Sequence, residues 1–130
     1  ASLPWVEQGV QDTIAEVTPE RTILAIPFYT RLWKTTGGAV TSEAIGMDEA
    51  QNVLSTNGVE AVWDGSVGQN YATFEQDNST YQIWLEDAQS IAEKVKLIQK
   101  YNLAGVAQWK LGFENSSIWQ TISDNLQAAS

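Results

Sequence analysis

Aromatic and charged side chains follow two apolar stretches of the sequence. The first stretch, residues 23–26, leads to Tyr29, Arg31 and Trp33, and the second ends at Trp109. An indole or phenol ring can pack against the apolar face of a flat polar ligand, while neighbouring polar groups bind the ligand's hydroxyls. Residues of these types at the ends of two strands therefore indicate a site for a sugar-like ligand.

The carboxylates offer one further candidate for such a site. Glu114 follows Trp109 by five residues and precedes a predicted helix, so its side chain could contact the same ligand. Glu86 and Asp87 are adjacent at a helix start, where capping and an acidic N-terminal turn explain them better than catalysis does. No spacing of the Asp and Glu residues indicates an acid/base pair.

The composition excludes several classes of function. The chain contains no His and no Cys, which excludes His-dependent nucleophiles, disulfides and metal sites built on those residues. We expect neither a metal nor a cofactor. The formal net charge is −9 and the seven basic residues are scattered, which disfavours nucleic acid and anionic membrane surfaces as partners. No apolar run approaches the ~20 residues of a membrane span.

Core packing is the alternative explanation for each tryptophan. It applies to Trp109 at its strand end, and it is the better explanation for Trp5 and Trp119, which lie on amphipathic helices. Trp63 and Trp84 each alternate with a core candidate along a strand, so one of them could face a ligand. A second small core explains that pair equally well.

Helices and strands alternate at both ends of the sequence. The unbroken apolar run at residues 23–26 indicates a strand covered on both faces, as in a parallel sheet. Short connections around it predict parallel βα units, whereas the middle of the chain predicts antiparallel strands after a turn-rich stretch at residues 35–46. We expect helices at 2–17, 47–58, 87–101 and 116–127, strands at 23–26, 59–63, 70–76, 79–85 and 103–109, and turns at 64–65 and 77–78.

The predicted α/β frame is incomplete. Two parallel strands cannot make a closed parallel sheet, and the sequence does not begin with Met. We therefore expect a piece of a longer protein, whose open strand edges could let it self-associate.

Two segments and their spacing resemble a known family. The segments "TILAIPFYTRLW" (22–33) and "YQIWLEDAQSIAEKVKLIQKYNLAGVAQWKLGFE" (81–114), with an α+β insertion between them, are similar to the C-terminal third of a family 18 glycoside hydrolase. The similarity is closest to the chitinase-like branch of spore-cortex and cell-wall N-acetylglucosaminidases. It covers nearly all of the chain.

The resemblance implies a partial (β/α)8 barrel that carries a small α+β insertion domain. By this similarity, residues 1–33 are a barrel segment with the sixth helix and seventh strand. Residues 34–86 are the insertion domain, and residues 87–130 hold the seventh helix, the eighth strand and the last helix. The missing N-terminal barrel portion of the same protein is then an expected partner.

The resemblance also implies roles for the candidate site residues. Trp109 matches the tryptophan that floors the cleft, and Tyr29 and Arg31 match the rim, although Thr30 replaces the usual Gly. The run from Trp109 to Glu114 matches a W-R-L-G-x-E form, with Lys in place of Arg. Trp84, in the insertion, is a possible stacking residue.

The family's catalytic acid lies in a D-x-x-D-x-D-x-E signature that this sequence lacks. The resemblance implies retaining, substrate-assisted hydrolysis by the parent protein. We expect the general acid upstream of this chain, no catalytic residue within it, and no activity from the fragment alone.

Three hypotheses follow for function. In the first, the chain is the substrate-cleft portion of a glycoside hydrolase acting on β-1,4-linked N-acetylglucosamine polymers, in peptidoglycan or chitin. In the second, it is a non-catalytic carbohydrate-binding module or a catalytically dead chitinase-like protein. In the third, it is a structural fragment whose aromatic residues only pack. The first implies an extracellular location, in a bacterial cell wall or spore envelope.

Overall fold

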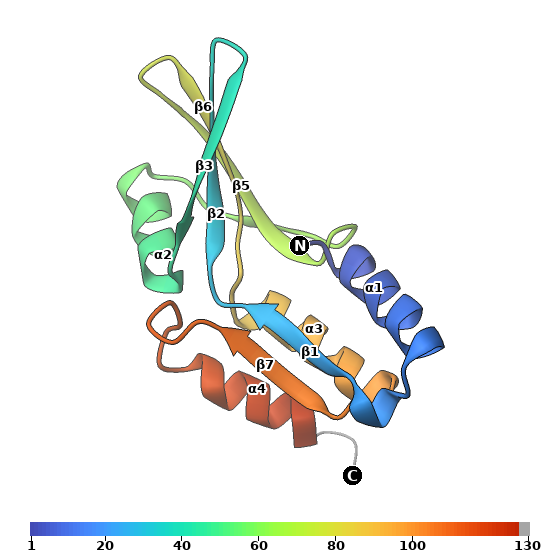
Figure 1. Ribbon diagram of the computed structural model, residues 1–130. Helices are drawn as coiled ribbons and strands as arrows, with labels where there is room; N and C mark the ends of the chain where they lie inside the picture. The colour runs from blue at the N-terminus through green and yellow to red at the C-terminus, as the bar shows by residue number, and fades with distance from the viewer. Residues whose placement is uncertain (128–130) are drawn as a thin grey trace.

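The computed structural model describes residues 1–127, which form one parallel and one antiparallel β-sheet with helices around them (Figure 1). The helices are α1 (Leu3–Glu16), the short 3₁₀ helix η1 (Pro19–Arg21), α2 (Met47–Thr56), α3 (Ala88–Lys100) and α4 (Ile118–Gln127). The strands are β1 (Ile23–Pro27), β2 (Thr30–Thr36), β3 (Ala39–Ile45), β4 (Val62–Asp64), β5 (Gln69–Gln76), β6 (Ser79–Trp84) and β7 (Gly105–Trp109).

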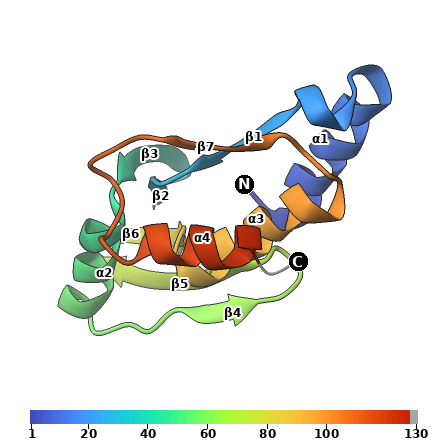
Figure 2. The same ribbon diagram turned by 90° about the horizontal axis from the view of Figure 1, so that it is seen from below.

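The parallel sheet consists of β1 and β7, and it joins the two ends of the chain. Its register pairs Ile26 with Gln108 and Pro27 with Trp109. The helices α3 and α4 lie on the same side of this sheet (Figure 2). Ile26 packs there against Ile91 of α3 and Ile118 of α4, all 2 % exposed or less. The parallel pairing predicted from the apolar run is therefore confirmed.

The prediction that this first strand is covered on both faces is wrong for the part of the chain that the structure describes. Ile23 of β1 is 61 % exposed, and a hollow lies between β1 and α1. Trp5 of α1 lines that hollow and is 72 % exposed, so its predicted core packing is also wrong. Both residues are exposed because no described segment lies in the hollow between the strand and the helix.

The antiparallel sheet has the strand order β3-β2-β6-β5-β4. Its inner face packs on α2 through a core that includes Leu32, Ile83 and Ala72 of the sheet and Ala50 and Leu54 of the helix. The predicted antiparallel strands and the short helix are confirmed, although the strand expected at 59–63 begins later, at Val62.

The turn-rich stretch predicted at residues 35–46 is a hairpin instead, and most of it is strand. Gly37 and Gly38 have positive φ angles of 56° and 87° and form the tight turn that joins β2 to β3. Residues 39–45 then pair along the whole length of β2. The β-branched residues Val40, Thr41 and Ile45 of β3 favour a strand, and pairing with β2 forms it. The turn predicted at Asp77–Asn78 is confirmed, with φ angles of 49° and 56°.

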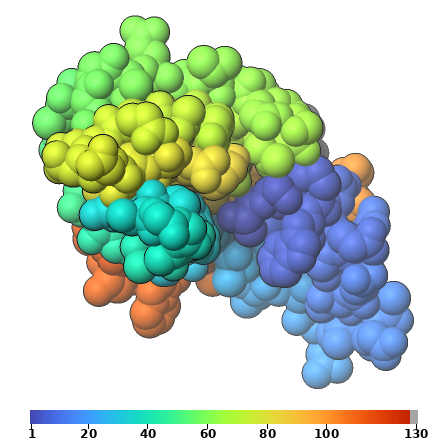
Figure 3. All heavy atoms as spheres, turned by 90° about the horizontal axis from the view of Figure 1, so that it is seen from above, coloured from blue at the N-terminus to red at the C-terminus, as the bar shows by residue number. Residues whose placement is uncertain are grey.

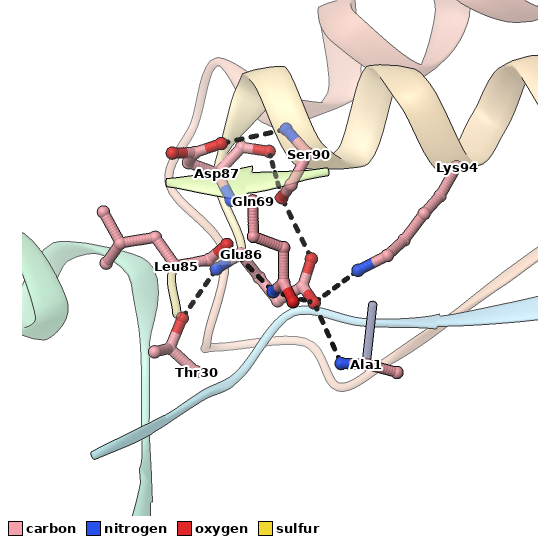
Figure 4. Close-up of polar contacts among 8 residues, drawn as sticks. All are labelled: Ala1, Thr30, Gln69, Leu85, Glu86, Asp87, Ser90 and Lys94. Atoms are coloured by element: carbon pink, nitrogen blue, oxygen red, sulfur yellow. Dashed lines mark hydrogen bonds and ion pairs between the residues drawn. The ribbon is translucent and has the colours of Figure 1, made fainter. Parts of the chain in front are cut away.

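A buried polar cluster joins the two sheets (Figure 4). The Glu86 carboxylate accepts from Lys94 Nζ at 2.5 Å, from Gln69 Nε2 at 3.0 Å and from Ser90 Oγ at 3.0 Å. The Glu86 backbone N–H donates to Thr30 Oγ1 at 2.8 Å. Since Thr30 begins β2 and Glu86 follows β6, the cluster fixes both chain crossings between the sheets at one point.

The acidic pair at the start of α3 divides into two roles. Asp87 is the predicted cap: its carboxylate accepts from Ser90 N at 2.9 Å, while Ser90 Oγ accepts from Asp87 N at 3.0 Å. Glu86 lies outside the helix and is buried, so its interpretation as part of an acidic helix turn is wrong.

Helix α1 is attached at its start and along one side. The Leu3 N–H donates to Val67 O at 2.7 Å. Glu7 accepts from Lys100 Nζ at 2.5 Å and from Tyr101 OH at 2.6 Å. These two hydrogen bonds lower the pKa of Glu7, as expected for a carboxylate that is bound in its charged form. None of the helices within residues 1–127 has the length and apolar character needed to cross a membrane.

Replacing Gly68 by Ala is expected to loosen the attachment of α1. Gly68 has a φ angle of 67°, and a Cβ at this position would lie 2.7 Å from Leu3 Cβ. Gly58 is the matched control, because its φ angle is 63° but a Cβ would meet nothing within 4 Å. We expect Gly58→Ala to cost about 1 kcal/mol through the left-handed backbone alone, and Gly68→Ala at least about 1 kcal/mol more. Equal urea midpoints for the two variants would contradict the close packing of Leu3.

Candidate functional site

A hollow opens where β1 and β7 end, and we call it the strand-end hollow. It has a volume of about 670 Å³. Its lining is mainly aromatic and apolar, with two cationic side chains: Ala25, Ile26, Pro27, Tyr29, Arg31, Ala44, Trp109, Lys110 and Phe113. The pairing of Pro27 with Trp109 brings the chain segments that follow both strands to the same end of the sheet, as the parallel arrangement predicts.

Trp109 presents its indole to this hollow instead of the core. Its side chain is 66 % exposed, so the alternative that it packs as a core plug does not hold in residues 1–127. The neighbouring Leu111 is 74 % exposed. The peptide bond between Trp109 and Lys110 is cis. An exposed indole beside cationic groups can stack on a flat, hydroxylated ring.

The other lining groups are held by specific contacts. The rings of Tyr29 and Phe113 meet edge to face, with centroids 6.4 Å apart, and Lys110 Nζ lies 5.1 Å from the Phe113 centroid. Arg31 donates to Ser42 Oγ from Nε at 3.0 Å and from Nη2 at 2.7 Å. These contacts restrict the side chains before any ligand binds, which reduces the entropy that binding must overcome.

A second hollow lies between α1, β1 and the antiparallel sheet, and we call it the inter-sheet hollow. Its volume is about 970 Å³, and Tyr29 and Arg31 line it as well as the strand-end hollow. Trp84 lies in its wall, packed on Tyr71 with ring centroids 4.8 Å apart. Seen from above, the N-terminal end of α1 lies beside the β2–β3 hairpin (Figure 3).

The predicted site residues differ in which of the two hollows they line. Tyr29 and Arg31 lie with Trp109 in the strand-end hollow and also with Trp84 in the inter-sheet hollow. Glu114 lines neither hollow, and its Oε2 accepts from the Gly112 N–H at 2.8 Å.

Sequence reasoning missed Phe113, Tyr71 and Gln82. Phe113 carries no periodic signal, because it lies in a loop after β7. Gln82 could have been found from strand alternation, since it lies two residues from the candidate Trp84 on the same face of β6. Tyr71 lies on the neighbouring strand and was not indicated by a local pattern, because its contact with Trp84 depends on the pairing of β5 with β6. Within residues 1–127, no group of three or more His, Cys, Asp or Glu side chains is arranged to hold a metal ion.

A parallel β-sheet with helices packed on it, beside an antiparallel sheet, defines an α/β protein. A chitinase from Chromobacterium violaceum ATCC 12472 superposes with a TM-score of 0.89 over 98 % of this chain and 39 % of its own, at 22 % identity. The chain belongs to the glycosyl hydrolases family 18, whose sequence model matches residues 4–114. The resemblance recognised in the sequence is therefore confirmed.

Two relatives extend this similarity to spore enzymes. The spore cortex-lytic enzyme of Bacillus megaterium QM B1551 has a TM-score of 0.85 and 25 % identity over 95 % of this chain and 30 % of its own. A cortical fragment-lytic enzyme of Bacillus subtilis (strain 168) is 25 % identical over 122 residues, which are 92 % of this chain and 28 % of the relative. The chain thus spans about a third of the length of the proteins it matches.

Proposed function

We propose that this chain is the substrate-cleft portion of a family 18 glycosidase acting on β-1,4-linked N-acetylglucosamine polymers, in peptidoglycan or chitin. The observation that carries the proposal is the exposed indole of Trp109, which lies with Tyr29 and Arg31 in one hollow at the end of the parallel strands. Indole and phenol faces suit the apolar face of a pyranose, and the guanidinium donates hydrogen bonds to its oxygens. The relatives named for cortex lysis and for chitinase activity support the same class of substrate.

The proposal also includes the place of this chain in a larger barrel. In the described residues β1 pairs only with β7, and the outer edges of both strands are open. A pair of this kind fits the last βα units of a (β/α)8 barrel. Residues 1–33 and 87–130 are then barrel segments, residues 34–86 are an α+β insertion domain, and the remaining barrel portion of the protein is the partner that completes the sheet.

The catalytic acid lies outside this chain in the proposed scheme. No carboxylate lines the strand-end hollow within residues 1–127, and Glu114 is directed to the Gly112 N–H. Two positioned carboxyl groups, or one with the substrate's own acetamido group, are needed to cleave a glycosidic bond. This chain therefore supplies surfaces that hold the sugar and leaves proton transfer to the rest of the protein.

A hydrolysis assay tests whether this chain binds the sugar without supplying the general acid. We expect the 130-residue chain to release no product from a chromogenic N-acetylglucosamine oligomer, whereas the full-length protein hydrolyses it. The absence of product follows from the missing general acid. Clear turnover by the purified chain, above that of a mock purification, would place the acid within it and overturn the scheme.

The alternative function is non-catalytic carbohydrate binding by a chitinase-like protein. The lack of a carboxylate in the strand-end hollow favours it equally. The same assay on the full-length protein separates the two, because a binder retains affinity for the oligomer without hydrolysing it. In either case, the spore and sporulation enzymes among the Bacillus relatives favour action at a bacterial cell wall or spore envelope, outside the cell.

A further inference from the structure

We propose that Glu114 is a positioning residue for the strand-end hollow and does not contact the ligand itself. It holds the turn at residues 110–113, which carries two side chains of the hollow's lining, Lys110 and Phe113. The inference rests on the proposed function and deepens it, because it gives a role to a carboxylate whose place in the sequence suggests a ligand contact. Glu114 lines neither hollow, so its effect on a ligand must pass through other side chains.

The Glu114 carboxylate binds the turn that follows β7. The Phe113 N–H donates to Lys110 O at 3.2 Å, and Gly112, the third residue of the turn, has a φ angle of 97°, which favours glycine at this position. The hydrogen bond that closes the turn does not use the Gly112 N–H, which donates to Glu114 Oε2 at 2.8 Å. The carboxylate therefore satisfies a backbone donor of the turn and restricts its conformation.

The start of α2 holds the same turn from the other side. Gly46, the N-cap residue of α2, has no side chain that could accept from the first N–H groups of the helix. The Met47 N–H donates instead to Phe113 O at 2.7 Å. A Cβ at Gly46 would lie 3.2 Å from Phe113 O and 3.4 Å from Phe113 Cδ1. Since Met47 is only 2 % exposed, the turn rests against a buried and well-packed helix start.

Phe113 connects the turn to the lining of the hollow. Its ring meets the Tyr29 ring edge to face, with centroids 6.4 Å apart, and Lys110 Nζ lies 5.1 Å from its centroid. All three side chains line the strand-end hollow. Loss of the Glu114 contact would free the turn, and a ligand would then have to order the Phe113 ring and the Lys110 side chain as it binds.

The first test compares two substitutions of Glu114 in the full-length protein. Isothermal titration would use the dimer and the hexamer of N-acetylglucosamine. We expect Glu114→Ala to weaken binding of both about fivefold, the loss that one or two newly ordered side chains predict. Glu114→Gln keeps an oxygen that can accept from the Gly112 N–H and should retain most of the affinity. An equal loss in both variants would contradict a role based on this hydrogen bond.

A double-mutant cycle with Phe113→Leu distinguishes positioning from direct contact. If Glu114 acts through Phe113, adding Glu114→Ala to Phe113→Leu should weaken binding by less than about twofold, because the group that it positions is already absent. A loss that stays about fivefold in the Phe113→Leu background would mean that Glu114 contacts the sugar directly, and it would overturn the inference.

A third variant displaces Phe113 from the side of α2. In Gly46→Ala, the new Cβ would push on the Phe113 backbone and ring, and we expect affinity to fall roughly threefold. Gly65→Ala is the matched control, because a Cβ at that exposed position would meet only Trp63 Nε1, at 3.7 Å. Its affinity should equal that of wild type, and equal affinities of the Gly46 and Gly65 variants would contradict the contact between α2 and the turn.

All titrations are made well below the melting temperature of each variant, so that the measured protein is folded. A Glu114→Ala variant that melts earlier but binds both oligomers like wild type would show a merely structural role and overturn the inference, while the proposed function stands. If wild type binds neither oligomer, the proposed function itself fails, and this inference fails with it.

Discussion

Replacing Lys94 by Met is expected to lower the free energy of unfolding by about 3–5 kcal/mol, because it leaves a buried carboxylate without its cation. Lys94 and Glu86 are 1 % and 3 % exposed, and their charged groups are 2.5 Å apart. Gln69 and Ser90 still donate to Glu86 in the variant, but neutral donors offset only part of the cost of a buried charge. The melting temperature should fall by roughly 10 °C or more.

A second lysine on the same helix provides a matched control. Lys96 pairs with Glu93 at 2.6 Å, but the two side chains are 56 % and 35 % exposed. We expect Lys96→Met to cost about 0–1 kcal/mol, the usual range for a solvent-screened surface pair. The two variants remove the same group from positions two residues apart, so their difference measures burial. Equal melting temperatures would contradict the buried position of Lys94.

A double variant measures the interaction between Glu86 and Lys94 apart from their contacts with other residues. Glu86→Gln combined with Lys94→Met removes both charges, so the buried position no longer holds an unpaired ion. We expect the double variant to be more stable than Lys94→Met alone, with a coupling free energy of about 1–3 kcal/mol in urea unfolding. Strict additivity would show that Glu86 and Lys94 act independently.

The buried Glu86–Lys94 ion pair lies where the chain passes between the two sheets, and there it helps to position the candidate site. Thr30, bonded to Glu86 through the backbone N–H, begins the strand that carries Arg31 and Trp33. Trp84 precedes Glu86 by two residues on the strand that enters the cluster. The cluster therefore orients the antiparallel sheet relative to β1 and β7, and with it the distance between Trp109 and these residues of the antiparallel sheet.

Local patterns predicted the elements whose signals lie within a few residues. Asp87 was recognisable as a helix cap because capping involves only the next turn, and Asp77–Asn78 as a turn because both residues tolerate a positive φ angle. The hairpin at residues 35–46 was missed because its two glycines suggested a long loop. Val40, Thr41 and Ile45 favour a strand, but the partner that completes it, β2, lies across the Gly37–Gly38 turn and follows from pairing and not from a local pattern.

Some residues of the candidate site were likewise predictable from the local sequence, whereas others depend on tertiary contacts. Trp109, Tyr29 and Arg31 were found from the principle that parallel strands end on one side of a sheet, and they do share a hollow. Glu86 was interpreted from its neighbour Asp87, whereas its contact with Lys94 depends on which side chain faces the junction of the sheets. Trp5 follows an amphipathic pattern, but its exposure depends on what lies beside α1.

Replacing Trp109 by Ala is expected to weaken binding of an N-acetylglucosamine oligomer by at least about tenfold while leaving stability almost unchanged. Tryptophans at the centre of a binding site commonly contribute about 2 kcal/mol or more, which corresponds to a factor of roughly 30 in affinity. Stability should change little, because the indole is 66 % exposed and its removal leaves no cavity in the core.

The control for this variant is Leu111→Ala, which truncates a neighbouring side chain that is 74 % exposed. Leu111 lines neither hollow, so its loss should change neither affinity nor stability. Titration of the full-length protein with the dimer and the hexamer should then show both ligands weakened by Trp109→Ala and neither by Leu111→Ala. If Trp109→Ala binds as tightly as wild type, the indole does not hold the sugar, and the strand-end hollow is not the place where the polymer binds.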